Sequence, residues 1–305
     1  MDTYATPSKA SVLKVTVLVE DYAGYDARGL LGQHGLSVLL EIAGNDGITR
    51  RVLLDVGQSF SVIARNASIL KVKGLLRRVD AVMLSHNHYD HSGGLLGLLK
   101  WLRLPPNTLP LYAHPDAFLP SIVLREGKRV NVGVPVTLEE LKAFGANPTL
   151  SKEPALIEGV PGAYFLGEIP RVKGPEPKVQ DNYVVLGDGA LKPHPLRDDT
   201  ALAVVVEGYG TVVITGCSHS GILNIVEHAA KVTGEGVKAV LGGLHLILSE
   251  EPEVEEVKRG LKDAGVEELH VGHCTGLRAE CGLLRGWGKS FRRIRSGYTA
   301  EWRAR

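Results

Sequence analysis

The chain has 305 residues, of which 35 are Lys or Arg and 34 are Asp or Glu, so its net charge is +1. This balance, without a basic tract or a basic patch interleaved with aromatic residues, gives no support for a nucleic-acid partner. The longest apolar runs, such as 95–99, are too short to span a bilayer. Three cysteines without a CxxC pair argue against a disulfide framework.

A chain of this length forms either two domains or one large α/β unit, and we expect a single domain over residues 1–305. The polar stretch Met1–Pro7 lacks the basic and apolar regions of a secretory signal, so we expect a cytoplasmic protein that does not contact a membrane. The low content of Met and Cys suggests a thermophilic source. Oligomeric state is not predicted.

Apolar runs bounded by turn residues predict strands in the first half of the chain, at 12–20, 36–42, 51–55, 80–84 and 109–113. Helical patterns in this half predict a helix at 60–72, one from near Gly94, and one that Thr137 opens through a capping box. Of these elements, the strand at 80–84 matters most, because a cluster of histidines follows it directly.

The second half begins with a Gly- and Pro-rich stretch at 159–181, which predicts a long loop over the site. A hairpin at 201–207 and 211–214 follows. Strands at 237–241 and 268–271 then alternate with helices that start near Ser220, Val254 and Leu277. The chain begins with antiparallel strands, and helices and strands then alternate in both halves. This order suits two packed sheets with helices on the outside.

The most informative stretch is His86-Asn87-His88-Tyr89-Asp90-His91, which follows the apolar run 81–84. His86 and His88 stand two apart, so in extended backbone their rings project to the same side. Asp90 and His91 follow at a turn, and Ser92-Gly93-Gly94 then opens a helix. Neutral nitrogen donors with a carboxylate predict a metal site with positions left open for water or substrate.

These residues resemble the HxHxDH motif of the metallo-β-lactamase superfamily. The resemblance implies a four-layer αββα sandwich, in which His86 and His88 bind one metal and Asp90 and His91 bind a second; a single metal is the alternative. We expect one or two divalent ions, with zinc as the default and iron or manganese accepting the same donors.

Further ligands come from the same resemblance. Cys217-Ser218-His219 is similar to a later strand-end motif, with Cys217 where an Asp usually bridges the metals. His219 is the better ligand candidate, whereas Cys217 is either a thiolate ligand or a small buried residue. His273 resembles the final histidine ligand, and Cys274 beside it is predicted to pack.

The superfamily's middle histidine has no clear equivalent near 195–199 unless His194 reaches in. Either an aspartate there substitutes, or His219 takes over, or one metal site is weakened. Asp55, in a strand-end Asp-x-Gly, is predicted to orient a ligand imidazole rather than bind metal itself.

Three other histidines are candidates for the pocket. His245 follows two glycines and either acts on the substrate, as a catalytic residue with Asp90, or caps a strand end. His34 and His114 either bind substrate or serve the local structure. The remaining histidines are predicted to lie at the surface or to pack: His194, His228 and His270.

Several stretches between about residue 12 and residue 297, including Glu20-Asp21, Gly167–Arg171 and His273–Gly276, resemble one subgroup of the superfamily. That subgroup includes an archaeal synthase that joins a hydroxymethyl-dihydropterin diphosphate to a ribofuranosylaminobenzene phosphate in methanopterin biosynthesis. The resemblance implies a small phosphate-bearing substrate. Arg171 then suits a bidentate phosphate contact, although a solvated loop arginine is the alternative.

Three functions stay open at this point. The first is the synthase reaction, with metal acting on the diphosphate leaving group. The second is a metal-dependent hydrolase of a phosphoester, thioester or other ester, in which the metal activates water. The third is a module that binds metal and a small ligand without turnover.

Overall fold

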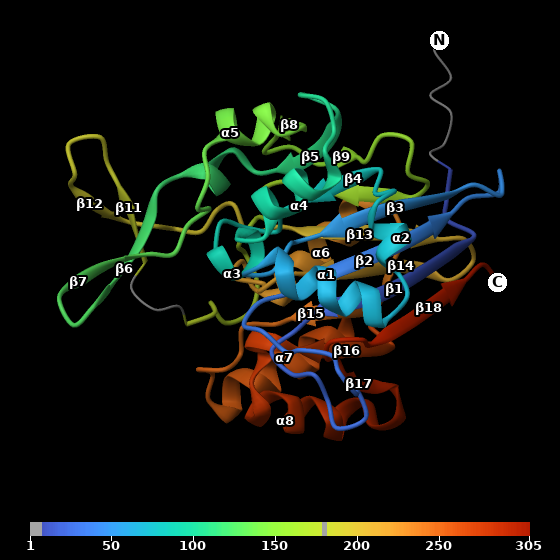
Figure 1. Ribbon diagram of the computed structural model, residues 1–305. Helices are drawn as coiled ribbons and strands as arrows, with labels where there is room; N and C mark the ends of the chain where they lie inside the picture. Colours follow the sequence, from blue (N-terminus) through green and yellow to red (C-terminus); the bar gives the residue numbers. More distant parts are fainter. Residues whose placement is uncertain (1–7, 179–181) are drawn as a thin grey trace, which may run out of the picture.

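Two seven-stranded sheets pack face to face in the computed structural model, which describes residues 8–178 and 182–305 (Figure 1). The first sheet has the order β18 (Thr299–Arg303), β1 (Val12–Val19), β2 (Ser37–Ala43), β3 (Thr49–Leu54), β4 (Ala81–Met83), β5 (Leu109–Ala113) and β8 (Ala146–Leu150). The second has the order β17 (Phe291–Arg293), β16 (Glu268–Gly272), β15 (Val237–Gly243), β14 (Gly210–Thr215), β13 (Ala201–Val206), β10 (Ala163–Phe165) and β9 (Ala155–Leu156).

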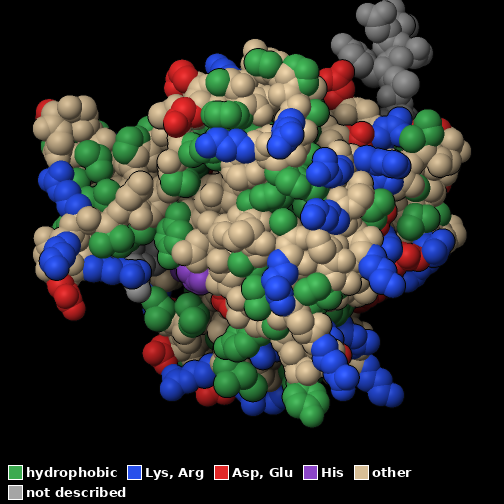
Figure 2. Space-filling view, in the orientation of Figure 1, with side chains coloured by type: hydrophobic (Ala, Val, Ile, Leu, Met, Phe, Trp, Pro, Cys, Tyr) green, Lys and Arg blue, Asp and Glu red, His purple; other side chains and the backbone are tan. Residues whose placement is uncertain are grey.

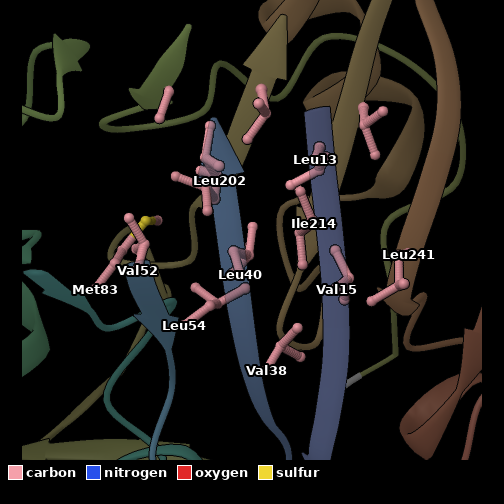
Figure 3. Close-up of a cluster of buried hydrophobic side chains, with 14 of the residues drawn as sticks. Leu13, Val15, Val38, Leu40, Val52, Leu54, Met83, Leu202, Ile214 and Leu241 are labelled. Carbon is pink, nitrogen blue, oxygen red and sulfur yellow. The ribbon is translucent and has the colours of Figure 1, made fainter. Parts of the chain in front are cut away.

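The main core lies between these two sheets (Figure 3). Alternate residues of a strand point to opposite faces. Val38 and Leu40 of β2 therefore meet Leu202 and Ile214 of the second sheet, while Leu39 packs outward in a different apolar cluster. Both faces of each sheet are buried, which explains why the strands are almost continuously apolar.

Helices cover the outer face of each sheet. Those on the first sheet are α1 (Phe60–Ile69), α2 (Lys73–Leu76), α4 (Leu95–Leu102) and α5 (Leu138–Ala143). Those on the second are α6 (Ile222–Thr233), α7 (Glu251–Asp263) and α8 (Leu277–Trp287). The predicted αββα sandwich is thus confirmed, and the pairing of β1 with β18 across the chain supports our proposal of a single domain.

A third, four-stranded sheet was not predicted. It has the order β12 (Leu191–Pro193), β11 (Asn182–Val185), β6 (Ser121–Arg125) and β7 (Lys128–Asn131), and it projects from the sandwich (Figure 1). Glu126 and Gly127 join β6 to β7, with φ values of 50° and 73°. Two residues with positive φ make a tight hairpin turn, so Glu-Gly between the apolar stretch 122–124 and Val130 was a usable signal.

Other boundaries differ from the predictions. The stretch 159–181 is not wholly a loop, because β10 lies within it, and its last residues, 179–181, are outside the described part. The helix predicted at 60–72 ends at Ile69, and Lys71 adopts a φ of 61° before α2. Met1–Pro7, on which the signal-peptide prediction rests, is also outside the described part. Each helix within 8–178 and 182–305 is too short or too polar to cross a bilayer.

The core between the sheets gives a test of this packing. Ile214→Ala removes a side chain with no exposed surface, so we expect a loss of about 2–5 kcal/mol in the free energy of unfolding, measured by urea denaturation. Ile48→Ala is the matched control, because that side chain is 52% exposed and its loss should cost less than about 0.5 kcal/mol. Equal losses in the two variants would contradict the packing described.

Candidate metal centre

Polar side chains from both sheets meet at one edge of the sandwich. Asp55 follows β3 and His86 follows β4, which run parallel; His219, His245 and His273 follow β14, β15 and β16, which also run parallel to one another. The carboxyl ends of parallel strands share one edge of a sheet, and this is where α/β proteins commonly bind ligands. The topology therefore collects residues that are far apart in the sequence.

His86, His88 and His219 form a first group, whose ligand atoms lie within 4.8 Å of one another. Nε2 of His86 is 3.0 Å from Nδ1 of His88. His219 is buried, yet neither of its ring nitrogens has a hydrogen-bond partner among the described residues. Burial lowers the pKa of His88 to about 4, so this imidazole is neutral at pH 7. Buried neutral nitrogens without partners are what a divalent cation would satisfy.

Asp90, His91 and His273 form a second group; the first two lie on α3 (Tyr89–Ser92). Nε2 of His91 is 3.2 Å from Nε2 of His273 and 3.3 Å from Oδ2 of Asp90. Burial opposes charge on His91, but the carboxylates of Asp90 and Asp55 outweigh it and hold the pKa well above its usual value. Metal binding in this group would therefore compete with protons.

Cys217 lies between the two groups. Its Sγ is 3.3 Å from Nε2 of His91 and 3.3 Å from Nε2 of His273. Sγ also lies within 4.8 Å of a ring nitrogen of His86. The sulfur thus faces both groups, and nitrogen, sulfur and carboxylate donors together fit zinc.

Asp55 is linked by hydrogen bonds to both histidine groups, which is the arrangement that its proposed orienting role requires. Its Oδ2 is 2.6 Å from Nδ1 of His91 and accepts a hydrogen bond from the Ser85 hydroxyl at 2.7 Å. That hydroxyl is 2.8 Å from Nδ1 of His86. One carboxylate therefore sets the ring orientation in both groups. A Cβ on Gly216 would lie 2.1 Å from the same hydroxyl, so only glycine fits there.

The two aspartates near the place of the middle histidine bond backbone N–H groups beside the candidate ligands. Asp198 accepts a hydrogen bond from the backbone N–H of Asn87, and Asp199 accepts one from the N–H of Ser220. Burial raises the pKa of Asp198 to about 7 and that of Asp199 to about 6. Both aspartates therefore hold the loops that carry the histidines. Of the three alternatives, the geometry favours the one in which His219 takes over.

Sequence reasoning assigned no role to three residues that contact the centre. Glu20 accepts a hydrogen bond from the backbone N–H of His273 at 2.7 Å, and Oδ2 of Asp21 is 3.2 Å from Nδ1 of the same histidine. Both follow β1, and two acidic residues at a strand end were a usable signal. Nδ2 of Asn182 is 3.1 Å from Nε2 of His88. Asn182 begins β11, in the sheet that was not predicted, so nothing local pointed to it.

A pocket of about 400 Å³ opens over the centre. His88, Asp90, His219 and His273 line it from below. Apolar side chains form much of its wall: Val123, Val132, Leu196, Ile247 and Leu248. Arg125, at the end of β6, is the sole lysine or arginine among the described residues that line it. Figure 2 shows histidine side chains in a hollow beside the third sheet, which carries blue basic side chains.

The predicted pocket residues divide into two sets. His34 and His245 line the pocket, whereas Arg171 and His114 do not. The guanidinium of Arg171 instead donates a hydrogen bond to the carbonyl of Leu196 at 2.6 Å, and Nε2 of His114 is 3.3 Å from Oε2 of Glu168. Contact of Arg171 or His114 with substrate therefore stays a prediction, and Arg171 supports the pocket through Leu196. The histidines predicted to pack also lie outside the pocket: His194, His228 and His270.

Comparison with known sequences agrees with this geometry. A family model described as a β-lactamase superfamily domain matches residues 50–141. The 7,8-dihydropterin-6-methyl-4-(β-D-ribofuranosyl)-aminobenzene-5'-phosphate synthase of Methanocaldococcus jannaschii is 34% identical over 293 residues, which cover 95% of this chain and 96% of that protein. An uncharacterised protein of the same organism is 30% identical over 268 residues, which cover 87% of this chain and 91% of that protein.

Among solved structures, Tm1679, described as a metal-dependent hydrolase of the β-lactamase superfamily, is similar with a TM-score of 0.74 and 27% identity. The similarity covers 95% of this chain and 99% of that one. With the sandwich fold, the two groups of ligands and the near-full-length relatives, the chain belongs to the metallo-β-lactamase superfamily.

Metal analysis tests the assignment of the centre. His88→Ala removes a donor of the first group, so we expect the purified variant to lose most of its bound metal. His228→Ala is the control, because its ring bonds the carbonyl of Leu166 away from the pocket, and it should retain the metal. Metal contents equal to wild type in both variants would reject the assignment.

Proposed function

We propose that this protein is a metal-dependent transferase that joins a dihydropterin diphosphate to a ribofuranosylaminobenzene phosphate. The observation that carries the proposal is the 34% identity, over 95% of the chain, to a relative named as the synthase of the product. The pocket supports it, because both substrates combine a flat ring system with phosphate. The apolar wall suits the rings, and Arg125 suits the phosphate of the aminobenzene riboside.

A divalent cation held by the two groups would supply Lewis acidity that stabilises charge on the departing diphosphate. In the transfer itself, a bond forms between the aromatic amine nitrogen and the methylene carbon of the pterin. The C–O bond to the diphosphate breaks, and diphosphate leaves with the electron pair. The amine nitrogen then gives up one proton, which needs an acceptor in the pocket.

We assign this acceptor role to His34. Its ring is at the rim of the pocket and more than half exposed, with Nε2 3.6 Å from Oδ2 of Asp90 and Nδ1 3.4 Å from Oδ1 of Asp21. The hydrogen bond to Asp21 and the charge of Asp90 raise the pKa of His34, so the proton is accepted by the neutral form of the imidazole and the resulting imidazolium is stabilised. Asp90, predicted as catalytic, thus acts on His34 as well as in the second group. His245, also predicted as catalytic, is less exposed than His34 and lies beside Cys274. We therefore prefer His34 as the acceptor.

The reaction itself is the first test. Incubation with the pterin diphosphate and the aminobenzene riboside phosphate should release pyrophosphate, and a chelator should abolish the release. The matched controls omit one substrate at a time, since a transferase needs both, whereas hydrolysis of the pterin diphosphate to pyrophosphate needs only the first. Pyrophosphate released without the amine would contradict the transferase.

A hydrolase is the second candidate, favoured by the similarity to Tm1679, which is described as a metal-dependent hydrolase. The same groups would then hold a metal that activates water, and this water would attack a phosphoester, thioester or other ester. Robust cleavage of such esters, with no condensation, would support this candidate. A binding module without turnover is the remaining alternative, and a tightly retained ligand with no turnover of a broad substrate panel would support it.

Arg125 provides a test of the substrate class. A hydrogen bond to a charged group contributes about 1.5–3 kcal/mol. Arg125→Ala should therefore raise the KM for the aminobenzene riboside phosphate roughly 10- to 100-fold. Arg129→Ala is the control, because Arg129 is an exposed arginine of β7 that does not line the pocket. The two variants are compared by steady-state kinetics, and an unchanged KM in Arg125→Ala would remove this residue from substrate binding.

The remaining features are part of the proposal. We propose that the two groups bind one or two zinc ions. Iron and manganese are the alternatives, because they accept the same donors. The partner is a small phosphate-bearing molecule, without nucleic acid or membrane contact. Cytoplasmic location and a thermophilic source stay predictions from the sequence.

A further inference from the structure

A third group of metal-binding atoms lies beside the two histidine groups. It comprises Cys217, His245 and Cys274, whose Sγ and ring nitrogen atoms lie within 4.8 Å of one another. The three residues follow β14, β15 and β16, so the same strand ends that carry His219 and His273 also carry this group. Sγ of Cys274 lies 3.4 Å from the carbonyl oxygen of Cys217.

The backbone around this group leaves room for the sulfur and aims the imidazole. A Cβ on Gly243 would lie 2.6 Å from Sγ of Cys274, so glycine is needed where that sulfur sits. His245 has a φ of 50°, a left-handed conformation that non-glycine residues rarely adopt and that is concentrated at functional sites. The loops are also tied together: the Ser218 hydroxyl donates a hydrogen bond to the carbonyl of Gly243 at 2.7 Å.

His245 has a buried nitrogen without a partner. Its Nδ1 finds no hydrogen-bond acceptor or donor among the described residues. The centroid of its ring is 4.2 Å from that of His219, whose two nitrogens also have no partner there. Buried polar atoms in native structures are nearly always satisfied, so these nitrogens point to a ligand between the rings and the sulfurs.

We propose that Cys217, His245 and Cys274 form a thiolate metal-binding group that takes a thiophilic divalent cation such as Zn²⁺. Two sulfurs and one imidazole nitrogen supply three of the four positions of a tetrahedral site and leave one open to the pocket. Thiolate donors favour zinc over magnesium or manganese. Cys217 faces the histidine groups as well, so this cation would lie against them. Cys274, predicted to pack, becomes a ligand.

Cobalt substitution tests this proposal with a readout that does not depend on the reaction. The metal-free full chain is titrated with Co²⁺ alone, and sulfur coordination is read from the sulfur-to-cobalt charge-transfer absorption in the near ultraviolet. Visible d–d absorption reports total bound cobalt. We expect both the charge-transfer absorption and the d–d absorption in the wild type. Cys274→Ser should lose roughly half of the near-ultraviolet band, because one of two sulfur ligands is gone.

Cys281→Ser is the matched control, since Cys281 is the exposed cysteine of α8 and should leave both absorptions unchanged. His245→Ala should keep the sulfur band at saturation but bind this cobalt at least about tenfold more weakly, since metal sites lose 10–100-fold in affinity even when a supporting residue is removed. Circular dichroism of each variant distinguishes a lost ligand from a lost fold.

A full sulfur band in Cys274→Ser would overturn the proposal, because Cys217 alone would then bind the cobalt. Visible absorption without any sulfur band in the wild type would also overturn it, while leaving the histidine groups in place. Absence of both absorptions would reject the thiolate group and the histidine centre together. The transferase proposal is tested separately by pyrophosphate release, so the two can fail independently.

Discussion

The site depends on gathering several buried imidazoles while leaving nitrogens of His219 and His245 without a hydrogen-bond partner among the described residues. Taking such polar atoms out of water costs free energy unless something else satisfies them. His219 is the clearest case, since it is buried and neither nitrogen has a partner among the described residues. The other rings are held in place by hydrogen bonds with neighbouring residues. Asp55 and Ser85 fix His91 and His86, and the backbone N–H groups beside the histidines are held by Asp198 and Asp199.

The sandwich explains why this arrangement persists. Each loop that carries a ligand follows a strand buried on both faces, so the core between the sheets sets the position of the loop. Backbone conformations at the site are unfavourable in places: Asp55, Ser218, His245 and His273 all have positive φ. Such conformations cost of order 1–3 kcal/mol each, and the packed layers behind them provide the stability that tolerates this cost.

The third sheet gives the pocket its chemical character. Without β6 and β11, the histidine groups would face solvent on that side, and the pocket would lose Val123, Arg125 and Asn182. Asn182 also contacts His88 directly, so the projecting sheet is joined to the centre itself. The candidate metal ligands and this part of the pocket wall therefore come from different sheets. This separation is consistent with one superfamily fold serving different substrates.

The sequence by itself predicted many of the strands and the histidine cluster from local patterns, and the resemblance of its motifs to the metallo-β-lactamase superfamily implied the sandwich. Apolar runs give strands, and the spacing of His86, His88, Asp90 and His91 after one of them places four donors together. Tertiary structure alone decided the rest, because those contacts join distant residues. Glu20 and His273 are 253 positions apart, and His88 and Asn182 are 94 apart. No local pattern shows that His219 completes the first group, that Cys274 meets His245, or that Arg125 rather than Arg171 lines the pocket; only the packing of the sheets brings these residues together.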